Sequence, residues 1–232
     1  MSEAAVQDPR ESAPPLPSPV DGRRTRGDAS RRTVLHSATD LASVDGLDGL
    51  TIGRLATVSG RGKSSIATLF QSKEGLQLAT VAAARDVFTA LIVDRARTSP
   101  RGVPRLSALL RNALDYSRDR VFTGGCFFAA TAADVDSKPG PVRDAVRAAL
   151  VDWYGYLEAQ ARCAVAEGEL AAGTDPELLA FELVALNEEA NSRSLLLQDE
   201  RPYLLAARAM RERLCAAGAE PRLLTALDDR DR

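Results

Sequence analysis

The sequence contains little of several residue types on which whole classes of protein depend. Of its 232 residues, 5% are aromatic, one is a histidine, His36, and three are cysteines, Cys126, Cys163 and Cys215. Three widely spaced cysteines do not form a disulfide framework. A lone histidine has no second ligand at metal-binding spacing. The sequence also lacks the Gly-x-Ser-x-Gly elbow that would accompany a catalytic histidine in many hydrolases. We therefore expect no metal and no cofactor, a surface position for His36, and cysteines that fill apolar space.

Long apolar segments are also missing. The chain has no run of about eighteen apolar residues and no apolar core near its N-terminus, so the sequence predicts neither a membrane helix nor a secretion signal. The expected compartment is the cytoplasm. Apolar residues make up 45% of the chain, which is enough for a sizeable core, and they follow helical rather than alternating patterns. The expected fold class is all-α.

Two short helical patterns meet at a turn between residues 51 and 70. The first is capped by Thr51 and has apolar residues at positions 52, 55, 56 and 58. Turn-forming residues 59–62 follow, and the second pattern turns Ile66, Leu69 and Phe70 inward. Two short helices around a glycine-containing turn predict a helix-turn-helix, whose second helix carries a short, polar outward face suited to a major groove.

This part of the chain resembles the TetR family of bacterial one-component transcriptional regulators. The resemblance covers roughly fifty residues and rests on 32–42, 46–52, Arg54-Leu-Ala56 and above all Phe70-Gln-Ser-Lys-Glu-Gly-Leu76. The family usually has an aromatic residue at Ala42, Ser or Thr at Gly62 and Tyr at Ala67. Loss of that tyrosine removes a common phosphate or thymine-methyl contact, so the operator preference does not carry over.

The resemblance implies a three-helix DNA-binding head joined by a long helix to a helical ligand-binding and dimerisation domain. It implies three partners: a palindromic double-stranded DNA operator, a small-molecule effector and a second copy of the chain. Members of the family are usually repressors that the effector releases from DNA. Two alternatives stay open at this point, a helical enzyme that uses the same pocket and a regulator that senses redox state through Cys126 or Cys163.

Positive charge is concentrated on the predicted head. Residues 22–85 carry ten basic and five acidic side chains, whereas residues 86–232 carry nineteen basic and twenty-three acidic ones. Phosphate neutralisation requires such a bias. Arg61 is a candidate for a guanine or a phosphate contact, and Lys73, which stands unfavourably at the positive end of a helix capped by Ser72, for a phosphate contact or simple exposure. The predicted DNA-binding residues are Thr51, Arg54, Arg61, Lys63, Ser64, Ser65, Thr68 and Lys73.

The chain divides into four expected segments. Residues 1–30 form a disordered, proline-rich tail whose basic end, 23–32, either enters a minor groove or stays solvated. The helix-turn-helix domain covers 31–77, with its first helix starting near Ser30. The ligand-binding and dimerisation domain covers 78–217, with helices at 73–97, 103–121, 126–138, 142–167, 176–198 and 202–217. Residues 218–232 form a C-terminal tail.

The resemblance implies that the second domain contains the ligand pocket and dimerises through its last two long helices, 176–198 and 202–217, and residue type supplies the candidates. Helices from about Val87 through Glu167 should enclose the pocket, and their aromatic residues either line it or belong to ordinary core. Asn187 and Asn191 share a helix face and, if buried, need a ligand, a partner subunit or water as hydrogen-bond partner. The candidates for ligand binding are Phe88, Tyr116, Phe122, Cys126, Phe127, Trp153, Tyr154 and Asn187, with Phe128 and Tyr156 beside them. The candidates for a leucine-rich dimer seam, or else for an intramolecular core, are Leu179, Leu183, Leu186 and Leu195.

Overall fold

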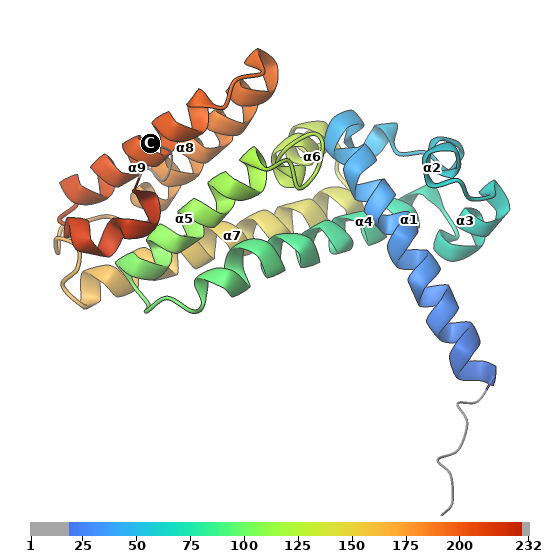
Figure 1. Ribbon diagram of the computed structural model, residues 1–232, viewed down its shortest axis with the longest axis horizontal. Helices are drawn as coiled ribbons and strands as arrows, with labels where there is room; N and C mark the ends of the chain where they lie inside the picture. Colours follow the sequence, from blue (N-terminus) through green and yellow to red (C-terminus); the bar gives the residue numbers. More distant parts are fainter. Residues whose placement is uncertain (1–18, 229–232) are drawn as a thin grey trace, which may run out of the picture.

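A computed structural model of the protein describes the backbone of residues 19–228 and the side chains of residues 27–228. All regular elements in this range are helical, which confirms the expected fold class. They are α1 (Pro19–Gly49), α2 (Ile52–Ser59), α3 (Lys63–Phe70), α4 (Lys73–Phe88), the π-helix η1 (Thr89–Asp94), α5 (Val103–Arg118), α6 (Phe127–Val135), α7 (Pro141–Ala166), α8 (Pro176–Leu197), α9 (Arg201–Ala216) and the 3-10 helix η2 (Pro221–Leu227). Figure 1 shows an elongated molecule, with α1, α2 and α3 at one end and α8 and α9 at the other.

The head, residues 19–77, contains the expected helix-turn-helix. The Thr51 hydroxyl accepts the backbone N–H of Arg54 at 3.2 Å and so caps α2. At the end of α2, Gly60 adopts a left-handed conformation with φ of 65°, which costs a glycine little and turns the chain toward α3. The head has its own small core, in which α1, α2, α3 and the start of α4 bury Val34, Ala38, Leu55, Ile66, Phe70 and Leu76.

Helix α1 is longer than the sequence predicts. It begins at Pro19 rather than near Ser30, so residues 19–30, expected as part of a disordered tail or a minor-groove arm, belong to a helix that projects beyond the rest of the head (Figure 1). Proline fits the first helical position, where its missing N–H is not needed, and each further residue adds one backbone hydrogen bond. The rest of the predicted tail, residues 1–18, lies outside the described residues.

Arg31 fastens this long helix to the recognition helix. Its guanidinium carbon lies 4.7 Å from the centre of the Phe70 ring, and its Nη1 donates to the Leu69 carbonyl at 2.8 Å. At the other end, α1 bends at Gly46, where φ is 72°. These contacts orient α1 relative to α3, and the basic residue that makes them was not singled out in the sequence.

Helix α4 connects the head with the body, residues 78–228. Ser72 caps it as predicted, accepting the Gly75 N–H at 2.9 Å. The stretch Lys73–Asp94 is the one described segment that is long and apolar enough to cross a membrane by length and composition. Its polar side chains are used within the fold, because Gln77 donates to the Leu47 carbonyl at 2.7 Å and Arg85 pairs with Asp152 of α7. An interior helix that packs on both domains has the same apolar composition.

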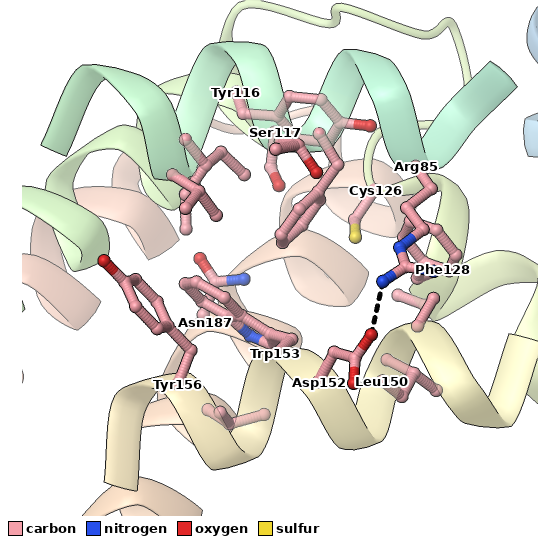
Figure 2. Close-up of a pocket in the computed structure, with 18 of the residues that line it drawn as sticks. Arg85, Tyr116, Ser117, Cys126, Phe128, Leu150, Asp152, Trp153, Tyr156 and Asn187 are labelled. Carbon is pink, nitrogen blue, oxygen red and sulfur yellow. Dashed lines mark hydrogen bonds and ion pairs between the residues drawn. The ribbon is translucent and has the colours of Figure 1, made fainter. Parts of the chain in front are cut away.

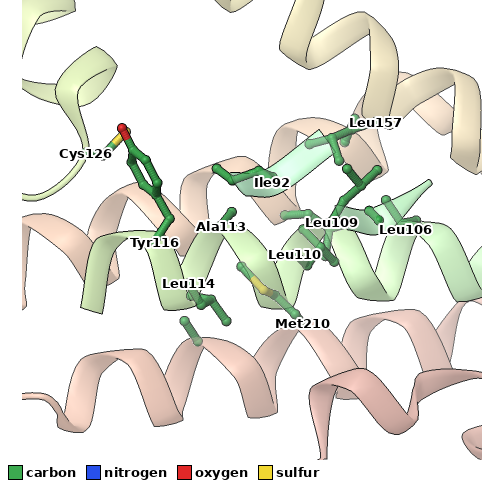
Figure 3. Close-up of a cluster of buried hydrophobic side chains, with 14 of the residues drawn as sticks. Ile92, Leu106, Leu109, Leu110, Ala113, Leu114, Tyr116, Cys126, Leu157 and Met210 are labelled. Atoms are coloured by element: carbon green, nitrogen blue, oxygen red, sulfur yellow. The ribbon is translucent and has the colours of Figure 1, made fainter. Parts of the chain in front are cut away.

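The body is built around α5, and its helices follow the predicted bounds closely. Figure 3 shows the leucines of α5 packed between Ile92 and Leu157 on one side and Met210 of α9 on the other. The predicted C-terminal tail is wrong for residues 221–227, because η2 buries Leu224 and Leu227 against this core. Arg111 of α5 closes the contact, since its guanidinium donates to the carbonyls of Ala226 at 2.8 Å and Asp228 at 3.1 Å.

Polar contacts hold the head on the body. In the loop before α6, the Thr123 N–H donates to Asp40 Oδ1 at 2.7 Å and the Gly124 N–H donates to Ser43 Oγ at 2.9 Å. At the end of α6, Asp134 Oδ2 accepts the Asp48 N–H at 3.0 Å. The loop and α6 therefore connect the last turns of α1 with the interior of the body.

Candidate functional site

The recognition surface is the outward face of α3 and its flanks. All of the predicted DNA-binding residues are exposed, and they lie on α2, α3, the turn between these helices and the first turn of α4. Ile66 and Phe70 of α3 are buried beneath them. The fold therefore presents Lys63, Ser64, Ser65 and Thr68 together to solvent.

Several of these side chains already have partners within the head. Arg54 pairs with Asp45 at 2.6 Å, Arg61 Nη1 donates to Ser30 Oγ of α1 at 2.9 Å, and Lys73 Nζ donates to the Asp48 carbonyl at 2.9 Å. Lys73 therefore stabilises the end of α1, a role that the sequence did not suggest. Lys63 has no hydrogen-bond or ion-pair partner among the described residues, so its charge is available to a phosphate.

A cavity of about 230 Å³ lies inside the body (Figure 2). It is enclosed by α4 with η1, by α5, by the start of α6, and by α7 and α8. Phe88 lines it and makes edge contacts with Tyr116, Phe128 and Trp153, at ring-centroid distances of 5.7, 5.7 and 5.1 Å. Such aromatic walls give the cavity a stable, mainly apolar lining.

The helix predicted over residues 73–97 changes at Thr89 into the π-helix η1, which the sequence did not predict, and η1 forms one wall of the cavity. Thr89, Ile92 and Val93 of η1 line the cavity. In a π-helix the backbone hydrogen bonds are displaced, and such segments gather at functional sites. Asn112 of α5 stabilises this one, because its Nδ2 donates to the Ile92 carbonyl at 3.0 Å.

The charged residues at the cavity are paired with one another. Arg85 pairs with Asp152, and Arg97 pairs with Asp94 at 2.7 Å. Burial raises the pKa of Glu188, and a hydrogen bond from Tyr154 works against that shift. Burial raises the pKa of Tyr154 to about 12, and the negative charge of Glu188 adds to this shift.

Three polar groups at the cavity have no hydrogen-bond partner among the described residues. They are the hydroxyl of Tyr116, the hydroxyl of Ser117 and Oδ1 of Asn187. Tyr116 is 3% exposed and Ser117 is fully buried. Burial raises the pKa of Tyr116, and the Cys126 thiol adds to this, whereas the Phe127 N–H that faces the Tyr116 oxygen opposes it. The tyrosine keeps its proton, and that proton has no acceptor within the cavity.

The predicted ligand-binding residues divide into three groups. Phe88, Tyr116, Cys126, Trp153 and Asn187 line the cavity, as do Phe128 and Tyr156. Phe122 and Phe127 do not. They are buried core residues behind the lining, where Phe122 makes edge contacts with Tyr116 and with Phe127.

Tyr154 faces a second hollow of about 300 Å³ on the outer side of α7 and α8, beside Phe181. The residues that the sequence missed are the polar ones, Arg85, Ser117 and Asp152. Ser117 could have been noticed as a small polar residue beside the buried stripe of α5. The ion pair of Arg85 and Asp152 could not have been predicted, because the two residues lie on different helices, α4 and α7.

The predicted dimer seam is wrong at Leu179 and Leu183. Both are fully buried within the chain, so neither can contact a partner. Leu186 and Leu195 are half-buried. The apolar side chains that α8 and α9 leave exposed are Leu178, Phe181, Leu196, Leu197, Leu204 and Leu205. Leu179 and Leu183 belong to the intramolecular core, so the exposed apolar residues of α8 lie on a different face of that helix.

Asn191 and the cysteines have structural surroundings. Asn191 is buried, and its Oδ1 accepts the Cys126 N–H at 3.0 Å, so it fixes the loop before α6. Burial raises the pKa of the Cys126 thiol, which keeps it protonated and disfavours the redox alternative at this residue. Cys163 and Cys215 are half-buried and free. His36 is exposed as predicted.

A helix-turn-helix head carried on a helical body with an apolar cavity defines a class of protein, the one-component DNA-binding regulators. Residues 102–210 match the family described as tetracyclin repressor-like, C-terminal domain. A TetR transcriptional regulator from Chloroflexus aurantiacus is similar in structure, with a TM-score of 0.70 and 25% identity over 80% of this chain and 94% of that chain. A TetR-family regulator from Agrobacterium tumefaciens has a TM-score of 0.72 and 21% identity over 81% of this chain and 98% of that chain.

A third similar structure is that of AibR in complex with isovaleryl coenzyme A and operator DNA. Its TM-score is 0.60, with 20% identity over 70% of this chain and 86% of that chain. No curated protein matches the sequence. The match over residues 102–210 and the shared fold bear out the resemblance of this chain to TetR-family transcriptional regulators.

Proposed function

We propose that this regulator binds a palindromic operator as a homodimer in the cytoplasm, represses transcription, and leaves the DNA when a small molecule enters the body cavity. The observation that carries the proposal is the exposed row on α3. Lys63 has a free charge, Ser64, Ser65 and Thr68 stand beside it, and the buried side of the same helix fixes their orientation. Lysine supplies phosphate affinity, and hydroxyls reach base edges or phosphates.

The apolar face of α8 and α9 supports dimerisation. Phe181 is 71% exposed and Leu196 82%, and the other apolar residues of this face are about half exposed. Exposed apolar residues in such number mark an interaction site, and a second copy of the same helices would complete a four-helix bundle. Two-fold symmetry then sets two recognition helices about one DNA turn apart, roughly 34–36 Å.

The route from cavity to head supports control by a ligand. Cys126, Phe128 and Ala129 line the cavity at the start of α6, and the preceding Thr123 and Gly124 bind α1. Arg85 also lines the cavity and lies on α4, which begins in the head. A ligand that binds better to one arrangement of these elements than to the other shifts the population of head positions. AibR, solved with a ligand and with operator DNA, offers a parallel.

Selection from a random DNA pool tests the proposal. The full-length protein should enrich a palindrome whose half-site centres are about one helical turn apart. Lys63→Ala should then weaken binding to all DNA and lower the slope of log affinity against log salt by about one unit.

Arg222→Ala is the matched control. It removes an exposed cation on η2, which Figure 1 places at the end opposite the head, so the salt slope should not change. No enriched sequence, or equal slopes for the protein and Lys63→Ala, would contradict the proposed role of α3.

A further inference from the structure

The body cavity has a mainly apolar lining that includes two hydroxyls without hydrogen-bond partners in the described part of the chain. We propose that its ligand is a small, uncharged, mainly apolar ring compound with a carbonyl oxygen, which accepts hydrogen bonds from the hydroxyls of Tyr116 and Ser117. The inference rests on the proposed function in one respect, because it takes the cavity for the effector site.

The size of the cavity sets the first limit. At about 230 Å³ it is smaller than the roughly 300–1,000 Å³ of pockets for drug-sized ligands. Phe88, Trp153 and Tyr156 line it with flat apolar surfaces. A compact ring fits these walls, whereas a nucleotide or a long acyl carrier does not.

The unpartnered hydroxyls set the second limit. Buried polar groups in proteins nearly always have partners, and a group left without one costs about 1–3 kcal/mol. The Tyr116 oxygen already faces the Phe127 N–H, so what it lacks is an acceptor for its own proton. Ser117 is the next residue on α5 and also lacks an acceptor. Figure 2 shows Tyr116 and Ser117 on the opposite side of the cavity from Trp153 and Asn187. Each donor can be satisfied by a carbonyl oxygen of the ligand.

The charges set the third limit. An anion would need a free cation, but Arg85 and Arg97 are each paired with an aspartate. A cation would need a free carboxylate. Asp94 and Asp152 are the partners in those pairs, and Glu188 holds the hydrogen bond of Tyr154. The Asn187 amide completes the site as a neutral group that can present either its oxygen or its nitrogen.

Trp153 makes the inference directly measurable, because it is the only tryptophan in the chain and it lines the cavity. Its fluorescence, excited where the probes do not absorb, should respond saturably to cyclohexyl methyl ketone. The matched probes are cyclohexyltrimethylammonium and cyclohexanecarboxylate, which keep the ring and replace the carbonyl group by a cation or an anion. The ketone should bind at least tenfold more tightly than either.

Two variants test the hydroxyls. Tyr116→Phe and Ser117→Ala should each raise the Kd for the ketone about fivefold, the value of one neutral hydrogen bond. Without ligand, Ser117→Ala should melt about 2–4 °C higher than the protein itself, since it removes a buried hydroxyl that has no partner among the described residues. Removal of a hydroxyl with a merely structural role would instead lower the melting temperature. Tyr203→Phe is the control, because it removes a buried hydroxyl on α9 that does not line the cavity.

The outcomes separate cleanly. Preferential binding of the ammonium or carboxylate probe overturns the charge argument, and unchanged ketone affinity in both variants overturns the role of the hydroxyls. No saturable response to any probe rejects the ligand class as a whole. None of these results touches DNA selection by α3, so failure of this inference and failure of the proposed function are distinguishable.

Discussion

The head and the body differ in how they treat their polar groups. In the head, polar side chains are exposed or bonded, and Asp45, whose Oδ2 is buried, pairs with Arg54 at 2.6 Å. In the body, Tyr116, Ser117 and Asn187 keep buried polar atoms without partners around a cavity. The buried polar groups of the head therefore have their partners without DNA, because DNA binds to an exposed surface. The body folds although these buried atoms lack hydrogen-bond partners, which a ligand could supply.

The head and the body also differ in their hydrophobic cores. The head rests on a small core of its own, while the larger core of the body also includes Ala42 and Leu47 from the end of α1. A change at the cavity therefore acts on elements that the head shares with the body. The following changes test this division, beginning with the largest expected effect.

Leu183→Asp should unfold the body rather than separate a dimer. Leu183 is fully buried, and a charge placed there lacks water and any partner, which costs more than about 4 kcal/mol. Circular dichroism should show loss of helix or a melting temperature lowered by more than about 10 °C.

Phe181→Asp is its counterpart, two residues earlier on α8 and 71% exposed. It should keep the fold and yield monomers by light scattering. A folded Leu183→Asp protein that has become monomeric would return the dimer seam to the buried leucines, and a dimeric Phe181→Asp protein would remove this face from the interface.

Gly124→Ala should loosen the head from the body. A methyl group at this position would stand 1.9 Å from the Ser43 carbonyl oxygen of α1, so the loop or α1 must move. Overpacking of this kind costs about 1–3 kcal/mol. The melting temperature should fall by several degrees, and operator affinity should change although no DNA-contacting residue is altered.

The control is Gly155→Ala on the exposed face of α7, where an added methyl group meets nothing within 4 Å. That change should stabilise the protein by up to about 1 kcal/mol, because alanine is the better helix former. Equal behaviour of the two variants would mean that the loop is not tightly seated on α1.

Local patterns predicted the head well. Caps at Thr51 and Ser72 and the turn at Gly60 each depend on neighbouring residues, and a short amphipathic helix reveals its inner face by spacing alone. The same reasoning found the bounds of α5, α7, α8 and α9. It failed at both ends of the chain, since the extension of α1 has no apolar stripe to reveal it, and η2 is short enough to pass for a tail.

The cavity could be predicted only in its aromatic half. Residue type pointed to Phe88, Tyr116 and Trp153, but it could not separate Phe127 from Phe128, which are neighbours with opposite roles. That choice depends on the rotation of α6 relative to its neighbours. The unpartnered hydroxyls and the Arg85 pair are properties of several helices together, so no single stretch of sequence contains them.

Arg61→Ala should cost about 1–3 kcal/mol of specific operator binding. In the free protein its guanidinium is held by Ser30 of α1, 2.9 Å away, from which it must reach the DNA. Competition with scrambled DNA separates base reading from phosphate contact, because equal losses on both sequences mean that Arg61 touches phosphate alone. Arg54→Ala is the comparison, and since Arg54 is expected at the backbone, it should lower affinity for both sequences alike.

The smallest expected effect is a pH dependence at the junction of the two domains. Burial alone would raise the pKa of Asp134, but the Lys138 ammonium and the Asp48 N–H outweigh it and hold the pKa below its usual value. The charged groups around it are Asp48 of α1, Lys138 after α6 and Lys73 of α4, which also approaches Asp48 at 3.9 Å.

A carboxyl group with a lowered pKa in the folded state is protonated more readily when unfolded. Its contribution to stability is therefore complete above about pH 4, the ordinary pKa of aspartate, and is lost as the pH falls through the lower folded value. Asp134→Asn should lower stability at pH 7 by about 1 kcal/mol and flatten the decline of the melting temperature below about pH 4. Asp136→Asn, at an exposed carboxylate at the end of the same helix, should leave that decline unchanged. If Asp134→Asn keeps the full acid decline, the head is held on the body by the contacts at Asp40 and Ser43 and not by this ion pair.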